Sequence, residues 1–122
     1  MALIYILEDD RNIREIEEIA LKNADYEVVS FETAAEFGKR LKERVPDLLL
    51  LDLMLPGISG EAVLEEIRKK GNLPVIVLTA KDSLDEKVEV LTSGADDYIT
   101  KPFEIREVLA RVQVQLRRKE EK

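Results

Sequence analysis

Hydrophobic residues occur along this chain in two alternating patterns. Short apolar runs of strand length alternate with longer segments in which apolar residues recur every three or four positions, the spacing of a helix. The runs predict strands at residues 2–7, 26–31, 48–51, 74–78 and 97–100. The segments between them predict helices at residues 12–22, 33–44, 60–70, 82–93 and 104–118.

The regular alternation of strand and helix favours one fold class. Residues 48–51 are four consecutive leucines with no polar alternate position, as expected for a strand covered on both faces. Short strands joined by helical crossovers predict a three-layer α/β/α sandwich around a five-stranded parallel sheet. At 122 residues the chain fits one domain, and it shows no internal repeat or domain boundary.

Two of the predicted helices have clear local signals. Thr33 and Glu36 have the spacing of a capping box, which predicts that a helix begins after Thr33. The first helix is predicted from apolar residues at helical spacing, namely Ile13, Ile16, Ile19 and Ala20.

Composition and charge narrow the classes of function. Hydrophobic residues make up 45% of the chain and charged residues 37%, which is typical of a globular domain. No apolar run approaches the roughly 20 residues that span a bilayer, and the first residues lack the basic region of a secretory signal. The net charge of -7 argues against nucleic-acid binding by this segment, because phosphate backbones bind to basic surfaces. We therefore expect a cytoplasmic protein without a membrane contact.

The residue types that are missing are also informative. With no cysteine, the chain has no disulfide, no thiolate metal site and no thiol catalysis. With no histidine, it has no imidazole-based triad, no typical zinc site and no phosphohistidine. If a phosphoryl group is carried by this chain, a carboxylate must hold it.

Polar residues stand where four of the predicted strands end. Glu8 and Asp9 follow the first strand, Asp52 the third, Thr79 the fourth and Lys101 the fifth. The carboxyl ends of parallel strands share one edge of a sheet, and ligands bind at that edge. Singly, such a carboxylate is usually a solvated cap and such a lysine a surface charge; their shared edge favours a common site.

The chemistry of this set points to a metal and a phosphoryl group. Crowded carboxylates either raise a pKa or bind a cation, and oxygen ligands without His or Cys predict Mg²⁺ or Mn²⁺. Lys101 and Thr79 could then hold the oxygens of a phosphoryl group on Asp52, the ammonium by charge and the hydroxyl by a hydrogen bond.

At this point the motifs resemble a known family. In order along the chain they are Leu7-Glu8-Asp9-Asp10, Leu51-Asp52-Leu53-Met54-Leu55-Pro56-Gly57, Leu78-Thr79-Ala80 and Tyr98-Ile99-Thr100-Lys101-Pro102-Phe103. Over about residues 2–118 the chain resembles a bacterial two-component response regulator receiver domain. The resemblance implies a doubly wound, flavodoxin-like sheet with strand order 2-1-3-4-5 and a site at the switch point.

The resemblance also implies a role for each site residue. Asp52 matches the phosphoacceptor, Asp9 a direct Mg²⁺ ligand, Glu8 its water-coupled neighbour, and Met54 the position whose backbone carbonyl completes the metal site. Thr79 and Lys101 match the residues that hold the phosphoryl oxygens, and Tyr98 matches the aromatic switch. Met54 and Lys81 match positions that tune hydrolysis, and Lys101-Pro102 matches a cis peptide bond. The implied phosphodonor is a histidine kinase or a small molecule such as acetyl phosphate, so the chain would catalyse only its own phosphorylation and dephosphorylation.

The resemblance is greatest to receivers of the OmpR/PhoB subfamily, which drive winged-helix transcription factors. It implies a homodimer on phosphorylation through the fourth helix, the fifth strand and the fifth helix. We call this surface the dimer face; its expected residues are Leu84, Lys87, Leu91, Asp96, Asp97, Glu107, Leu109 and Arg111. Lys87–Glu107 and Asp97–Arg111 are the expected pairs between subunits. DNA would then be bound only through a domain absent from this chain, and residues 119–122 would be a linker or a charged tail.

Three alternatives follow from the same residues. The chain could be a stand-alone regulator that docks on a partner protein, or a pseudo-receiver that keeps the fold without phosphorylation. Pseudo-receivers usually lose the acidic pair, the acceptor or the lysine, and this chain keeps all of them. A phosphatase of the haloacid dehalogenase type would carry a second Asp two places after Asp52, where this chain has Met54.

Overall fold

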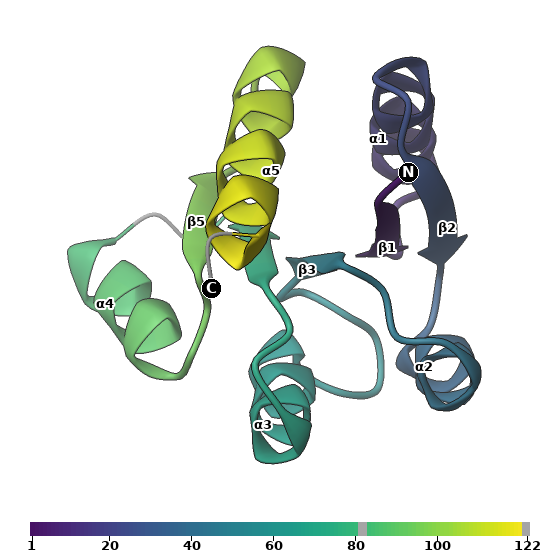
Figure 1. Cartoon of the computed structure of the whole chain (residues 1–122). Coiled ribbons are helices and arrows are strands. Elements are labelled where there is room, and N and C mark those ends of the chain that lie inside the picture. Colours follow the sequence, from purple (N-terminus) through teal and green to yellow (C-terminus); the bar gives the residue numbers. More distant parts are fainter. Residues whose placement is uncertain (81–82, 121–122) are drawn as a thin grey trace.

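Strands and helices alternate through the whole of the computed structural model, which describes residues 1–80 and 83–120 (Figure 1). The strands are β1 (Leu3–Leu7), β2 (Glu27–Phe31), β3 (Leu48–Asp52), β4 (Val75–Thr79) and β5 (Asp97–Thr100). The helices are α1 (Arg11–Asn23), α2 (Ala34–Glu43), α3 (Gly60–Lys70), α4 (Leu84–Thr92) and α5 (Ile105–Glu120). Each predicted element is present, with ends that differ by at most two residues.

The strands form one parallel sheet in the order β2-β1-β3-β4-β5. Helices α1 and α5 cover one face, and α2, α3 and α4 lie on the other (Figure 1). The predicted three-layer, flavodoxin-like fold is thus confirmed. The strand order reverses direction at β1 and β3, so the carboxyl ends of these two strands flank the crevice in which doubly wound folds bind ligands.

Alternate residues of the central strands build a separate core on each face. In β1, Tyr5 and Leu7 point to the side of α2 and α3, while Ile4 and Ile6 point to the side of α1 and α5. The leucines of β3 divide in the same way, and all four are buried. A strand covered on both faces has no exposed position, which explains its unbroken apolar sequence.

Helices α1, α2, α3 and α4 begin at side-chain caps. Thr33 accepts a hydrogen bond from the backbone N–H of Glu36 (3.2 Å), as the capping-box spacing predicts. Asp10, Ser59 and Ser83 cap α1, α3 and α4 in the same manner. Each cap satisfies a backbone donor that has no partner inside its helix, which fixes where the helix starts.

The buried face of α1 differs from the one that its isoleucines suggest. Ile16 and Ile19 are 52% and 62% exposed, whereas Glu17 and Leu21 are buried. Spacing alone shows that these residues form a helix, but packing beside β2 and α5 sets which face turns inward. A carboxylate is therefore buried where an apolar residue was expected.

Helix α5 ends at Glu120, so it continues past the boundary predicted at residue 118. Lys119 lies in its last turn and pairs with Asp47, with 2.9 Å between Nζ and Oδ1. Within the described residues, every helix is too short or too polar to cross a membrane.

Candidate phosphoacceptor site

The predicted site residues meet at the carboxyl edge of the sheet. Glu8 and Asp9 directly follow β1, and Asp52 is the last residue of β3. Thr79 is the last residue of β4, and Lys101 directly follows β5. Because β1, β3, β4 and β5 are neighbours in one parallel sheet, residues up to 93 positions apart in sequence lie together.

Glu8, Asp9 and Asp52 form a compact acidic cluster. Each offers one carboxylate oxygen, and the three oxygens lie within 4.8 Å of one another. Glu8 and Asp52 are buried, while Asp9 is exposed and leaves the cluster open to solvent on one side. Oxygen donors in a cluster that is open on one side suit Mg²⁺, which keeps several waters when it is bound. The residues present thus fit the predicted metal.

Lys101 links two members of the cluster. Its Nζ donates to Glu8 Oε1 at 2.7 Å and lies 3.4 Å from Asp52 Oδ2. The backbone N–H of Lys101 donates to the carbonyl of Thr79 at 2.8 Å, and the following peptide bond to Pro102 is cis, as the resemblance implies. One ammonium therefore offsets part of the charge of two buried carboxylates.

Burial and crowding shift the pKa values of this group. Burial, and the contact with Asp52, raise the pKa of Glu8 to about 7, against the opposing effect of Lys101. Burial lowers the pKa of Lys101, but Glu8 and Asp52 outweigh it, so the pKa ends above its usual value. Lys101 thus stays charged at neutral pH, while Glu8 gains or loses its proton near neutral pH.

Backbone contacts fix the carboxylates in place. Asp52 Oδ1 accepts a hydrogen bond from the backbone N–H of Met54 at 3.1 Å. The backbone N–H of Asp10 donates to Glu8 Oε2 at 3.2 Å, and Arg14 Nη1 donates to the Glu8 carbonyl at 2.9 Å. Sequence reasoning missed Arg14, because a single arginine in a helix gives no signal that it reaches back to a loop.

Gly60 holds the loop after Asp52 close to helix α3. A Cβ at this position would lie 2.5 Å from Leu53 Cα and 2.8 Å from the Asp52 carbonyl oxygen. No side chain fits at those distances, so only glycine allows this approach. The loop between Leu53 and Gly60 borders a hollow of about 650 Å³ beside Asp9. The sequence shows a glycine at the start of a helix but not the contact that requires it.

The family model of the response regulator receiver domain matches residues 4–113. The chain belongs to this family. Among curated proteins, the regulatory protein VanR of Enterococcus faecium is 46% identical to this chain over 115 residues. The aligned region covers 94% of this chain and 50% of VanR. The chain thus spans about half the length of that relative.

Solved structures agree with this assignment. The receiver domain of Francisella response regulator 1452 superposes with a TM-score of 0.93 at 31% identity, covering 98% of this chain and 99% of that one. The BeF3-activated N-terminal receiver domain of RstA from Klebsiella pneumoniae has a TM-score of 0.88 at 32% identity, covering 94% of this chain and 98% of that one. The chain is therefore the receiver domain of a two-component response regulator.

The predicted switch residues of this receiver domain are both buried. Thr79 is fully buried at the end of β4, and Tyr98 is 9% exposed. Lys87 Nζ lies 5.8 Å from the centre of the Tyr98 ring, within range of a cation–π contact. Tyr98 thus lies inward in this structure, and its movement on phosphorylation stays a prediction. Lys81, expected to tune hydrolysis, lies outside the described residues.

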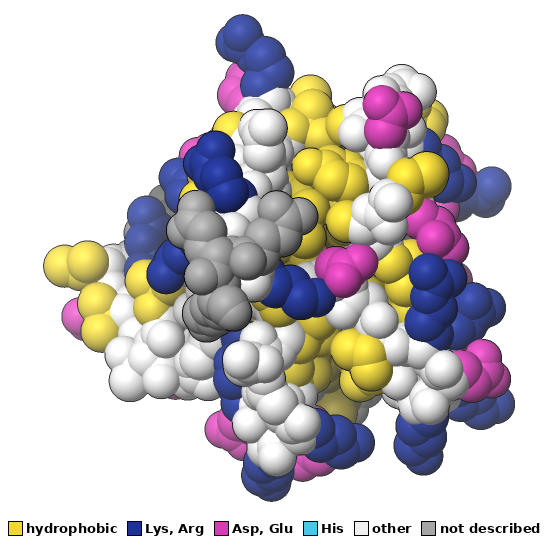
Figure 2. Space-filling model, in the orientation of Figure 1, with side chains coloured by type: hydrophobic (Ala, Val, Ile, Leu, Met, Phe, Trp, Pro, Cys, Tyr) yellow, Lys and Arg dark blue, Asp and Glu magenta, His cyan; other side chains and the backbone are white. Residues whose placement is uncertain are grey.

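The residues expected on the dimer face differ in exposure and in their contacts. Leu84 and Leu91 are 75% and 46% exposed on α4, and Figure 2 shows hydrophobic side chains at the left edge over this helix. Leu109 of α5, in contrast, is partly buried and packs against the core. The carboxylate of Asp96 accepts hydrogen bonds from Arg68 (2.7 Å) and from the backbone N–H of Val75 (2.8 Å). Asp96 is therefore held toward α3 and the start of β4.

One of the two expected pairs of the dimer face, Asp97–Arg111, is formed within one chain, and Glu107 pairs with the same arginine. Arg111 Nη1 lies 2.9 Å from Asp97 Oδ1, and Arg111 Nη2 lies 3.2 Å from Glu107 Oε2. These contacts, the one with Asp97 first, raise the pKa of Arg111, which stays charged. To pair with Asp97 of a second subunit, Arg111 would therefore have to leave Asp97 of its own chain.

Glu17 is a buried carboxylate that the motifs do not reveal. Its side chain is 1% exposed, and Oε1 is buried without a hydrogen-bond partner among the described residues. Burial is the main cause that raises its pKa to about 8, and the negative charge of Glu8 adds to the shift. At neutral pH we therefore expect Glu17 to be mostly protonated.

Proposed function

We propose that Asp52 of this receiver domain accepts a phosphoryl group from a phosphohistidine of a sensor histidine kinase, or from a small phosphodonor. The observation that supports this most directly is the position of Lys101, whose ammonium lies 3.4 Å from the Asp52 carboxylate while it is held by Glu8. A cation in that place is poised to pair with a phosphoryl oxygen bonded to Asp52.

The surrounding residues divide the work of the transfer. The backbone N–H of Met54 donates to Asp52 Oδ1, and Asp52 Oδ2 lies 3.4 Å from Lys101 Nζ, so the carboxylate that attacks phosphorus is held at both oxygens. Lys101 offsets the charge that develops on the transferred group, and Thr79, at the end of the neighbouring strand, offers a hydroxyl. When bound at Glu8, Asp9, Asp52 and the Met54 carbonyl, Mg²⁺ supplies further positive charge to the phosphoryl oxygens.

The test is phosphorylation with acetyl phosphate and Mg²⁺, followed by intact mass. We expect a gain of one phosphoryl group that is lost in Asp52→Asn. The matched control is Asp25→Asn, because Asp25 has a positive φ of 70°, which asparagine also tolerates. No mass gain, with beryllofluoride also failing to bind, would leave the pseudo-receiver as the better description.

We further propose that phosphorylation controls a homodimer through the dimer face, as in receivers of the OmpR/PhoB subfamily. Two features support this output: the exposed leucines of α4, and the charged cluster of Asp97, Glu107 and Arg111 beside them. In a two-fold dimer each exchanged pair would form twice. In a transcription factor, such a dimer would bring together the two DNA-binding domains that are linked to the two receivers.

The charge of Arg111 provides the test of this dimer. Reversal in Arg111→Glu removes both contacts of the cluster and places like charges together, so we expect the activated dimer to weaken at least tenfold. The measurement is sedimentation of the beryllofluoride-treated protein, with Arg117→Glu as the control on an exposed position of the same helix. An unchanged dimer would refute this interface, and a monomer in the unaltered protein would favour docking on a partner.

A further inference from the structure

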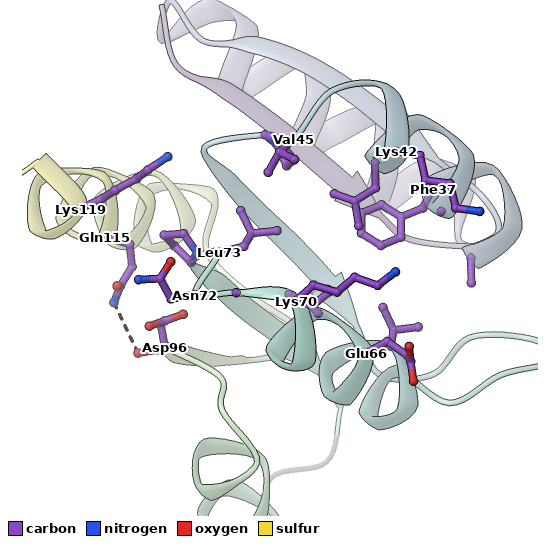
Figure 3. A pocket seen from close by; sticks show the side chains of 18 of the residues that line it. Phe37, Lys42, Val45, Glu66, Lys70, Asn72, Leu73, Asp96, Gln115 and Lys119 are labelled. Atoms are coloured by element: carbon purple, nitrogen blue, oxygen red, sulfur yellow. Dashed lines mark hydrogen bonds between the residues drawn. The ribbon is translucent and has the colours of Figure 1, made fainter.

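Helices α2 and α3 border a groove that has no part in the phosphoacceptor site. Its volume is about 620 Å³, and it extends from Ala34 and Ile58 to Arg118 and Lys119 near the end of α5. Figure 3 shows Phe37, Lys42 and Val45 on one side of it and Glu66 and Lys70 on the other. We call this cavity the α2–α3 groove.

The wall of the groove is mainly aliphatic. Leu41 comes from α2, Val63 and Ile67 from α3, and Leu73 and Pro74 from the segment before β4. Phe37 is the one aromatic side chain among the described residues that line it. Figure 2 shows hydrophobic side chains in a hollow between α3 and α2, with Lys or Arg side chains around it. Such a surface favours an apolar chain over a polar ligand.

The charges around the groove do not balance. Its two carboxylates are already paired, Glu66 with Lys69 at 3.3 Å and Asp96 with Arg68 at 2.7 Å. Lys119 is likewise paired, with Asp47. Among the described residues, however, no ion pair includes Lys42, Lys70 or Arg118, which also line the groove.

Lys42, Lys70 and Arg118 thus form no ion pair among the described residues, although the net charge of the chain is -7. Helix α2 ends at Glu43, next to Lys42, and helix α3 ends at Lys70, so the backbone presents carbonyl groups at this end of the groove. Backbone carbonyls repel an anion, so the attraction for one at this end comes from the side chains of Lys42 and Lys70.

We propose that the α2–α3 groove binds a small amphiphilic anion, a medium-chain acyl carboxylate, with its chain on the apolar wall and its carboxylate near Lys42 and Lys70. The volume lies in the range of small-molecule sites, about 300–1,000 Å³. The groove's lining does not include Asp52, Lys101 or the other residues of the phosphoacceptor site, so this function is separate from phosphorylation.

The test is a titration of the whole chain with decanoate, followed by calorimetry and by backbone amide NMR shifts. We expect saturable binding to one site, with shifts concentrated on α2, α3 and the end of α5. Removal of two methylene groups, as in octanoate, should weaken binding about tenfold. Decanol, which has the same chain without the charge, should also bind more weakly than decanoate.

Matched variants test where the anion lies. Lys42→Gln with Lys70→Gln should remove most of the preference for decanoate over decanol. Lys22→Gln with Lys39→Gln changes the net charge equally at exposed positions outside the groove, and it should leave binding unchanged. Val45→Asp, at a lining position that is 67% exposed, should weaken decanoate binding without loss of the fold, which thermal unfolding would verify.

Several outcomes would overturn the proposal. These are no saturable binding, equal affinity for decanol and decanoate, or the same loss in both double lysine variants. A second copy of the chain could instead fill the groove. In that case the mass in sedimentation would double with concentration in the absence of decanoate, and Val45→Asp would abolish the doubling.

Discussion

At the scale of single residues, two buried carboxyl groups at the site have a cationic partner, and a third buried carboxyl group nearby does not. Lys101 offsets the negative charge of Glu8 and Asp52. Glu17, in contrast, has a buried oxygen without a hydrogen-bond partner among the described residues. An unpaired buried polar group costs about 1–3 kcal/mol of stability. Glu17 is thus a destabilising residue next to the functional site.

Replacement of Glu17 should stabilise the protein. Leucine is similar in size and carries no polar atom, so Glu17→Leu should raise the free energy of unfolding by about 1–3 kcal/mol at pH 7. Urea unfolding followed by circular dichroism measures this change. A loss of stability in Glu17→Leu would mean that the carboxyl group stabilises the folded protein and would contradict this prediction.

The gain from Glu17→Leu should also depend on pH. The pKa of Glu17 is raised from 4.5 to about 8 on folding, so the folded state binds the proton more tightly than the unfolded state does. The stability of the unaltered protein therefore falls as pH rises from about 4.5 to 8. The advantage of Glu17→Leu should therefore be larger at pH 8 than at pH 5. An advantage that stays constant or shrinks would contradict this linkage.

At the scale of elements, the sequence predicts each strand and helix because local patterns determine them. The capping box at Thr33 depends on a residue three positions along the chain. The unbroken leucines of β3 reflect burial on both faces of the strand. The strand-end positions of Asp52 and Lys101 follow from the same patterns, since a parallel sheet brings its carboxyl ends together.

What the sequence could not predict depends on how elements pack against one another. The rotation of α1 about its axis decides that Glu17 is buried and Ile16 exposed. The distance between β5 and α5 lets Arg111 reach Asp97 within one chain. The groove between α2 and α3 depends on the gap between two helices, which no local pattern encodes.

Gly60 tests the contact between α3 and the loop that follows Asp52. A methyl group in Gly60→Ala would lie 2.5 Å from Leu53 Cα, so the loop must shift. We expect a loss of stability of about 1–3 kcal/mol and slower phosphorylation by acetyl phosphate. The control is Gly38→Ala within α2, where a Cβ meets nothing within 4 Å and should stabilise the helix slightly. Equal effects of the two substitutions would refute the role of Gly60.

At the scale of the whole molecule, we expect the acidic cluster to couple metal binding to stability. A ligand that binds only the folded state adds about 2.7 kcal/mol when its concentration is 100 times its Kd. Mg²⁺ should therefore raise the melting temperature beyond the effect of NaCl at equal ionic strength. Asp9→Asn should remove much of this rise, because Asp9 is the exposed member of the acidic cluster and its replacement leaves the core intact.

The gain from Mg²⁺ should increase with pH, opposite to the trend that Glu17 imposes on the metal-free protein. Glu8, whose pKa burial raises to about 7, must lose its proton before it can help to hold a cation. Thermal unfolding with and without Mg²⁺ at pH 6, 7 and 8 would measure the difference. We expect it to widen as Glu8 ionises, and to widen less in Glu8→Gln. If the gain were the same at each pH, Glu8 would not take part in the metal site, and Asp9 and Asp52 would have to bind the ion alone.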